Sequence, residues 1–323
     1  MMKAVVIKQF GGPEVLQVED RPIPIIAENE VLIAVKAAGI NRPDVFQRMG
    51  KYPAPPSVVQ DIPGLEVSGI IEEVGSEVRD FQIGDRVIAL VPGGGYASHV
   101  SVHYGSCIHL QDSVDLVAAA ALPETMYTVW HNMVERGKLQ TGERVLIHGG
   151  AGGIGSTAIQ LAKLSGAEVV TTISSEKKAH FVKKLGADEI INYKNEDFES
   201  NLLDSKVHLV LDYIGGDYFN KNINILHEDG RLIYINAMSG AKVNLNLIKL
   251  MQKRLTISGS TLRNRSAEFK KSLSSAIQVQ VMPWITAGKF EIPIYKQFHF
   301  TEAKQAHELM ESGDFLGKIV LVF

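Results

Sequence analysis

The stretch RVLIHGGAGGIG, residues 144–155, places an apolar run directly before a cluster of glycines. A run typical of a helix, residues 156–164, follows the last glycine. Gly150, Gly152 and Gly155 fit the pattern G-x-G-x-x-G, which lets the backbone approach a pyrophosphate at the positive end of a helix. The strand-like and helix-like flanks are the setting that this motif requires. The stretch therefore predicts a dinucleotide-binding turn, and the alternative is a tight strand–helix turn that binds nothing.

The composition is that of an ordinary globular protein. A length of 323 residues exceeds what one hydrophobic core usually supports, so two domains are expected. The net charge of −3 gives no general basic field, and no nucleic-acid partner is expected. The single cysteine, Cys107, excludes an internal disulfide and a four-cysteine zinc site. Neither a signal peptide nor an apolar run of about 18 residues is found, so we expect a cytoplasmic protein without a membrane span.

The pattern of secondary structure changes near Pro123. Residues 1–124 read as short strands separated by turns, which predicts a β-rich domain. Strand and helix patterns alternate from 125 to about 260, which predicts a parallel sheet with right-handed crossovers. The remaining segment contains one more helix pattern, residues 301–312, and a final strand, residues 318–323.

Several further motifs extend the pattern around the glycine turn. They are Gly142-Glu143, Gln160, Lys163, Asn41-Arg42-Pro43-Asp44, LVPGGGY at 90–96 and Gly186-Ala187-Asp188. On these residues, nearly the whole chain resembles the zinc-free branch of the medium-chain dehydrogenase/reductases, and within it the zeta-crystallin-like NADPH:quinone oxidoreductases. The resemblance implies an α/β protein with two domains. A GroES-like catalytic domain would comprise residues 1–124 and 265–323, the C-terminal segment returning to complete it, and residues 125–264 would form a Rossmann domain.

The residues at the expected metal-ligand positions speak against zinc. Zinc-dependent relatives carry G-H-E-x-x-G, whereas this chain has GLEVSG at 64–69. Leu65 stands where the histidine ligand is expected, and Asn41 aligns with the first cysteine ligand. Catalytic zinc needs about three protein ligands. We therefore expect no metal site.

The end of the second strand of the expected Rossmann domain bears on the choice of nucleotide. NAD-binding sites usually place Asp or Glu there for the ribose 2′-hydroxyl, but this chain has Ser174 and Ser175. A 2′-phosphate needs hydroxyl donors and positive charge, and in the resembling family the positions of Lys178 and Tyr193 bind it. The prediction is NADPH rather than NADH. Glu176 is counter-evidence because it could reach a 2′-hydroxyl, and Lys178 could also be an ordinary solvated helix residue.

The resemblance implies further cofactor contacts at the carboxyl ends of the strands and in the C-terminal segment. Together with the turn and the 2′-phosphate residues, the expected cofactor-binding set is Gly150, Gly152, Gly153, Ile154, Gly155, Ser174, Ser175, Lys178, Tyr193, Tyr213, Ile214, Asn236, Ala237, Met238, Arg263, Phe315, Gly317 and Lys318.

Four residues match family positions around the nicotinamide and the acceptor pocket. Thr128 would hydrogen-bond the carboxamide, and Asn41 and Tyr52 would orient the ring or the acceptor carbonyl. The ordinary tyrosine pKa near 10 favours hydrogen bonding over proton donation by Tyr52. Asp44 is the fourth candidate. Asn41 could instead bond only to its own turn, and Asp44 could cap a helix.

These features predict a zinc-independent oxidoreductase that transfers a hydride, or electrons, from NADPH to a small-molecule quinone. Quinones are easily reduced, so they need no Lewis acid. One alternative is an NADPH-dependent reductase of activated double bonds, such as 2-alkenals or enones. Another is a non-catalytic NADPH-binding protein. The resemblance also implies a homodimer formed by pairing of an edge strand, residues 255–260, with its twin, while a covered edge in a monomer is the alternative.

Overall fold

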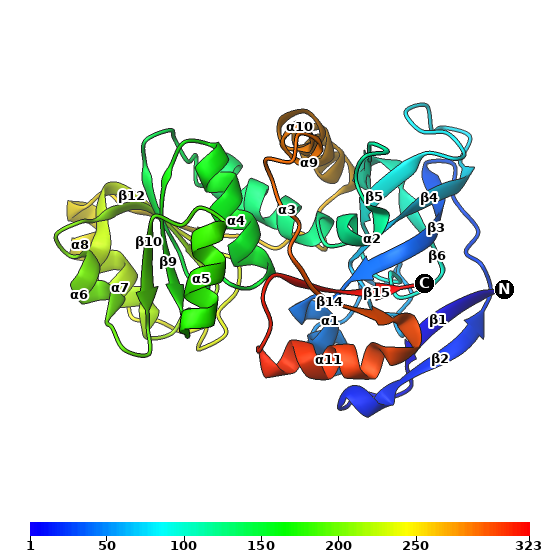
Figure 1. Cartoon of the computed structure of the whole chain (residues 1–323), viewed down its shortest axis with the longest axis horizontal. Coiled ribbons are helices and arrows are strands. Elements are labelled where there is room, and N and C mark those ends of the chain that lie inside the picture. The colour runs from blue at the N-terminus through cyan, green and yellow to red at the C-terminus, as the bar shows by residue number, and fades with distance from the viewer. The chain divides into compact units, whose positions relative to one another are not determined.

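The structure is a computed structural model that describes residues 1–323, and it divides into two compact units. Unit 1 comprises Met1–Tyr127 together with Arg263–Phe323, and unit 2 comprises Thr128–Leu262. Each unit contains its own main sheet (Figure 1). None of the helices has the length and apolar character needed to cross a membrane.

Unit 1 is built around a seven-stranded, mostly antiparallel sheet. Its strands are β14 (Ile294–His299), β15 (Lys318–Val322), β3 (Glu30–Gly39), β4 (Glu66–Val74), β5 (Arg86–Leu90) and β7 (Cys107–His109), in sheet order, with β6 (His99–His103) paired to β3. A separate hairpin contains β1 (Met2–Ile7) and β2 (Leu16–Arg21). The C-terminal strand β15 pairs antiparallel with β3, so the two ends of the chain share one core.

Short helices accompany the sheet of unit 1. They are α1 (Arg42–Arg48), α2 (Leu116–Ala119), α9 (Ala267–Gln280), α10 (Met282–Thr286) and α11 (Ala303–Ser312), and α3 (Pro123–Val129) spans the boundary between the units. Helix α11 packs against α1 and β15. Its buried face (Ala303, Ala306, His307 and Met310) has the 3–4-residue spacing of an amphipathic helix.

Unit 2 contains a six-stranded parallel sheet. In sheet order its strands are β10 (Glu189–Asn192), β9 (Glu168–Ile173), β8 (Arg144–Ile147), β11 (Val207–Asp212), β12 (Leu226–Tyr234) and β13 (Thr256–Gly259). Its helices are α4 (Gly153–Leu164), α5 (Glu176–Lys184), α6 (Phe198–Leu202), α7 (Tyr218–Ile225) and α8 (Leu247–Gln252). Numbered from β8, the strand order is 3-2-1-4-5-6, which is the order of dinucleotide-binding sheets, and the switch point lies between β8 and β11. The predicted fold class is therefore confirmed.

Two local features differ from the sequence-based prediction. The helix expected over residues 124–136 ends as α3 at Val129 and continues as a π-helix, Trp130–Arg136. The side-chain amide of Asn132 donates to the carbonyl of Thr128. In a regular α-helix this carbonyl would accept the backbone N–H of Asn132. In addition, the strands β2, β6, β7 and β14 and the helices α2, α6, α7, α8, α9 and α10 were not predicted from the sequence as separate elements. The strand expected at 255–260 is β13, and it does lie at the edge of the sheet.

Candidate active site

The glycine turn connects β8 to α4 in unit 2. A Cβ on Gly155 would lie 2.5 Å from the carbonyl oxygen of Gly149, so close packing of the helix against the turn requires glycine here. A Cβ on Gly152 would meet no heavy atom within 4 Å. Gly152 is also the N-cap of α4, and no side chain caps this helix end. The turn thus combines uncapped N–H groups with open space above them, which fits a pyrophosphate.

The residues expected at the 2′-phosphate follow the ends of β9 and β10. The ammonium of Lys178 donates to the Ser174 hydroxyl at 3.3 Å, and Ser175 caps the start of α5. The backbone N–H of Tyr193 donates to the carbonyl of Ile173, which brings the end of β10 beside the end of β9. Tyr193 is 45% exposed, so its phenol faces solvent. The Lys178 ammonium and the Ser174 hydroxyl therefore lie together, and the contact of these groups and of Tyr193 with a 2′-phosphate stays a prediction.

Residues after β11 and β12 lie at the same carboxyl edge of the sheet. The Tyr213 hydroxyl donates to the carbonyl of Gly149 at 3.0 Å, so this side chain lies on the glycine turn. The backbone N–H of Met238 donates to the Tyr213 carbonyl, which joins the two loops. The structure thus places Ile214, Asn236, Ala237 and Met238 in adjacent loops, as expected for strand ends that contact one cofactor.

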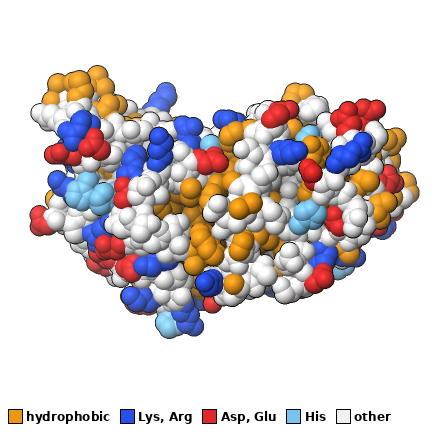
Figure 2. All heavy atoms as spheres, turned by 90° about the horizontal axis from the view of Figure 1, so that it is seen from above, with side chains coloured by type: hydrophobic (Ala, Val, Ile, Leu, Met, Phe, Trp, Pro, Cys, Tyr) orange, Lys and Arg blue, Asp and Glu red, His pale blue; other side chains and the backbone are white.

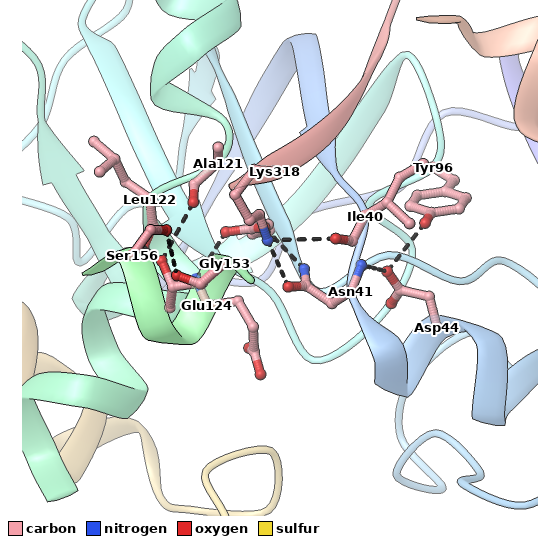
Figure 3. Close-up of polar contacts among 12 residues, drawn as sticks. Ile40, Asn41, Asp44, Tyr96, Ala121, Leu122, Glu124, Gly153, Ser156 and Lys318 are labelled. Atoms are coloured by element: carbon pink, nitrogen blue, oxygen red, sulfur yellow. Dashed lines mark hydrogen bonds and ion pairs between the residues drawn. The ribbon is translucent and has the colours of Figure 1, made fainter. Parts of the chain in front are cut away.

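A buried ion pair joins Glu66 of β4 to Lys318 of β15 in unit 1. Figure 3 shows Lys318 beside Asn41. The Lys318 ammonium donates to Glu66 Oε1 and to Asn41 Oδ1, both at 2.6 Å. The Asn41 amide N–H donates to Glu66 Oε1 at 2.8 Å, and the backbone N–H of Glu124 donates to Glu66 Oε2 at 2.8 Å. We call Asn41, Glu66 and Lys318 the Glu66 cluster. A Cβ on Gly39 would lie 2.0 Å from Glu66 Oε1, so glycine makes room for the carboxylate.

The Glu66 cluster fixes the orientation of Asn41. An ammonium can only donate, so Asn41 must present its carbonyl oxygen to Lys318 and its amide nitrogen to Glu66. One N–H of that amide remains for another partner. The Lys318 ammonium is committed within the protein, although the sequence analysis assigned it to the cofactor, and that contact stays a prediction.

Asp44 caps a helix, which was the second role that the sequence analysis allowed. Asp44 Oδ2 accepts the backbone N–H of Asn41 at 2.8 Å and the Tyr96 hydroxyl at 3.0 Å. Asn41 and Asp44 form the capping box of α1. Burial raises the pKa of Asp44 to about 7. The carboxyl group is fully buried, so we find support for a positioning role and none for contact with a substrate.

Arg263 holds the proline-rich loop that carries Tyr52. Its guanidinium donates to the carbonyl of Pro92 and to Gln47 Oε1, both at 2.7 Å. It also donates to the Tyr52 carbonyl at 3.2 Å and lies 5.1 Å from the centre of the Tyr52 ring. Burial raises the pKa of the half-buried Tyr52 phenol above its usual value, so the group is a hydrogen-bond donor at neutral pH. The predicted contact of Arg263 with the cofactor stays a prediction.

The other expected residues are placed as follows. Thr128 is half-buried on α3 and is the first residue of unit 2. Gly317 has a φ of +72°, and a Cβ there would lie 2.2 Å from the carbonyl oxygen of Pro293, so the turn into β15 requires glycine. Phe315 is half-buried, with its ring 6.5 Å from that of Tyr295.

Sequence reasoning missed Glu66 as a site residue. The available signal was an acidic residue inside the apolar strand pattern of GLEVSG. Leu65, at the expected metal-ligand position, is a buried core residue. No group of three or more His, Cys, Asp or Glu side chains is arranged to hold a metal ion.

Comparisons with known proteins agree with this architecture. The family described as alcohol dehydrogenase GroES-like domain matches residues 27–112, and the family described as zinc-binding dehydrogenase matches residues 153–278. Quinone oxidoreductase 1 of Escherichia coli (strain K12) is 32% identical, with all of both chains covered. The quinone oxidoreductase of Lama guanicoe is 30% identical over 100% of this chain and 98% of that protein.

A solved structure gives the same result. The Escherichia coli quinone oxidoreductase complexed with NADPH has a TM-score of 0.85 and 29% identity, and the match covers 100% of each chain. The fold and these matches define a medium-chain dehydrogenase/reductase. The chain belongs to the quinone oxidoreductase family, in the zinc-free branch of that superfamily.

Substitution of two glycines of the turn is expected to affect stability in one case and NADPH binding in the other. Gly155→Ala is expected to lower the free energy of unfolding by about 1–3 kcal/mol, because the new methyl overlaps the backbone of the turn. Gly152→Ala is expected to unfold like wild type but to raise the Kd for NADPH at least about tenfold, since its methyl occupies the space above the N–H groups. Denaturation and fluorescence titration measure both. Unchanged NADPH affinity in Gly152→Ala would contradict the proposed phosphate site.

Asp44 makes the stability of the protein depend on pH. Its pKa is about 7 when folded and near 4 when unfolded, so its contribution is complete below about pH 4 and is lost as pH rises through 7. Asp44→Asn keeps an oxygen for Asn41 and Tyr96 and does not titrate. The unfolding free energy of this variant minus that of wild type should increase by about 1–4 kcal/mol when the pH is raised from 4.5 to 8. Urea denaturation at both pH values tests this, with the exposed Asp204→Asn as control. A difference from wild type that is equal at both pH values would count against it.

Proposed function

We propose that this protein is a zinc-independent oxidoreductase that uses NADPH to reduce quinones. The observation that carries the proposal is the glycine turn with its open face at Gly152, in a chain that matches quinone oxidoreductases along its whole length. The Escherichia coli relative whose structure is described as complexed with NADPH supports the choice of cofactor. The NADPH site would comprise the glycine turn, the Ser174–Lys178 segment with Tyr193, and the loops after β11 and β12.

The bound nicotinamide supplies the hydride, and the residues of this chain position the reactants. The Tyr52 phenol stays protonated at neutral pH and would donate a hydrogen bond to the acceptor carbonyl. The free N–H of Asn41 is held in a fixed direction by the Glu66 cluster and would orient the nicotinamide or the acceptor. Thr128 would bond the carboxamide. Placement of this kind can lower a barrier by roughly 7–11 kcal/mol.

An acceptor panel tests the proposed activity. We expect NADPH oxidation with ortho- and para-quinones, slower oxidation with 2-alkenals, and much weaker activity with NADH. Turnover of alkenals well above that of quinones would favour a reductase of activated double bonds. Tight NADPH binding without turnover of any acceptor would favour a non-catalytic binding protein.

Lys178 is expected to distinguish NADPH from NADH. Its ammonium bonds Ser174 and would pair with the 2′-phosphate, which NADH lacks. Lys178→Ala should raise the KM for NADPH about tenfold and leave the KM for NADH within about twofold. Lys184→Ala, which changes an exposed lysine at the other end of α5, is the control, with little change for either nucleotide. Equal changes for both nucleotides in Lys178→Ala would refute the assignment.

We propose that the protein forms a homodimer through the edge strand β13. On the preceding helix α8, the residues Leu247, Ile248 and Met251 are 59–62% exposed to solvent. Such a group of exposed apolar side chains is unusual on the surface of a monomer. Figure 2 shows hydrophobic side chains gathered at the left end of the molecule, the end where Figure 1 places α8. Sedimentation analysis should show a dimer in wild type and a monomer in Ile248→Glu. Leu203→Glu, at another exposed apolar position, should stay dimeric, and a monomeric wild type would refute the dimer.

A further inference from the structure

A row of buried polar side chains lies beneath the carboxyl edge of the sheet in unit 2. His148 follows β8, Thr172 lies in β9, Asp212 ends β11 and Asn222 lies on α7. All four are at most 1% exposed. We call them the His148 chain. Buried polar groups are costly unless they bond one another, so the partners of each atom can be accounted for.

The donor and acceptor roles in the His148 chain can be assigned one after another, starting from Asp212. Asp212 accepts the backbone N–H groups of Ile214 and Gly215, and its Oδ2 accepts from the Asn222 amide nitrogen at 2.9 Å. The Asn222 oxygen therefore faces His148 Nε2, at 2.9 Å, and this nitrogen must carry the proton.

The other ring nitrogen of His148 is then an acceptor. It lies 3.3 Å from the Thr172 hydroxyl, which donates to it. The same hydroxyl oxygen accepts the backbone N–H of Gly149 at 3.0 Å. Burial lowers the pKa of His148, which agrees with a neutral ring. The imidazole has the Nε2–H tautomer.

The two ends of the His148 chain are backbone N–H groups in loops of the proposed NADPH site. At one end is Gly149, the first residue of the glycine turn, and at the other are Ile214 and Gly215 after β11. Thr172 also lies just before the Ser174–Ser175 segment. β9, β8 and β11 are neighbours in the sheet, so His148 in the middle spans the switch point. The rings of Phe198 and Tyr218, with centres 4.8 Å from that of His148, pack against it.

We propose that His148 is a positioning residue for NADPH, which couples the glycine turn to the loops after β9 and β11 so that the three loops present one preformed surface to the cofactor. The proposal rests on the proposed function, because it assigns NADPH to these loops. His148 touches no reacting atom in this account and acts through Thr172 and Asp212.

Substitutions that keep shape and remove hydrogen bonds test the proposal. Thr172→Val and His148→Phe should each raise the KM and Kd for NADPH about tenfold, while the KM for the quinone stays within about twofold. Thr172→Ser keeps the hydroxyl and should bind NADPH like wild type. Ile191→Val, a core change on β10, controls for lost stability and should leave NADPH affinity unchanged.

Nitrogen NMR of protein labelled at histidine reads the tautomer directly. The resonance that disappears in His148→Phe should show a protonated Nε2 and an unprotonated Nδ1. An Nδ1–H or doubly protonated ring would overturn the proposal. So would unchanged NADPH affinity in Thr172→Val and His148→Phe, or an equal loss in Ile191→Val. Wild-type protein that fails to bind NADPH would overturn the proposed function as well, which separates the two failures.

Discussion

The buried pair of Lys318 and Glu66 constrains several elements of unit 1 at once. A carboxylate with no solvent contact is tolerated only when cations and N–H groups satisfy it. Here the ammonium, the Asn41 amide and the backbone N–H of Glu124 do so. The need to satisfy this carboxylate also determines features of the neighbouring residues. It demands glycine at position 39, sets the direction of the Asn41 amide and holds the end of β15 against β3.

The two units organise their sites by different means. Unit 2 uses backbone: glycines allow α4 to approach β8 and leave N–H groups open. Unit 1 uses charged and polar side chains from distant segments. In both, the groups proposed to meet the cofactor or the acceptor are held by a layer of buried polar partners. The capping box of Asp44 and the His148 chain are two examples of that layer.

Sequence reasoning succeeded where the signal is local. The glycine turn, the alternation of strands and helices and the edge strand β13 each depend on a few neighbouring residues, and the structure contains all three. It missed what depends on distant partners. Glu66 and Lys318 are 252 positions apart, so no local sequence pattern predicts their contact. The π-helix was also missed: the Asn132 side chain bonds the Thr128 carbonyl where it begins, and no sequence pattern distinguishes this turn from an α-helix.

The return of the chain to unit 1 has a consequence for the order of synthesis. Unit 2 is continuous, whereas unit 1 needs β15, and with it the counter-ion of Glu66. At about 5–20 residues per second, a ribosome takes roughly 13–50 s to travel from Glu66 to Lys318. During that time the Glu66 carboxylate of β4 lacks its counter-ion, although the Asn41 amide and the Glu124 N–H have already been synthesised. The N-terminal part of unit 1 can therefore complete this buried ion pair only after the C-terminal strand has been synthesised.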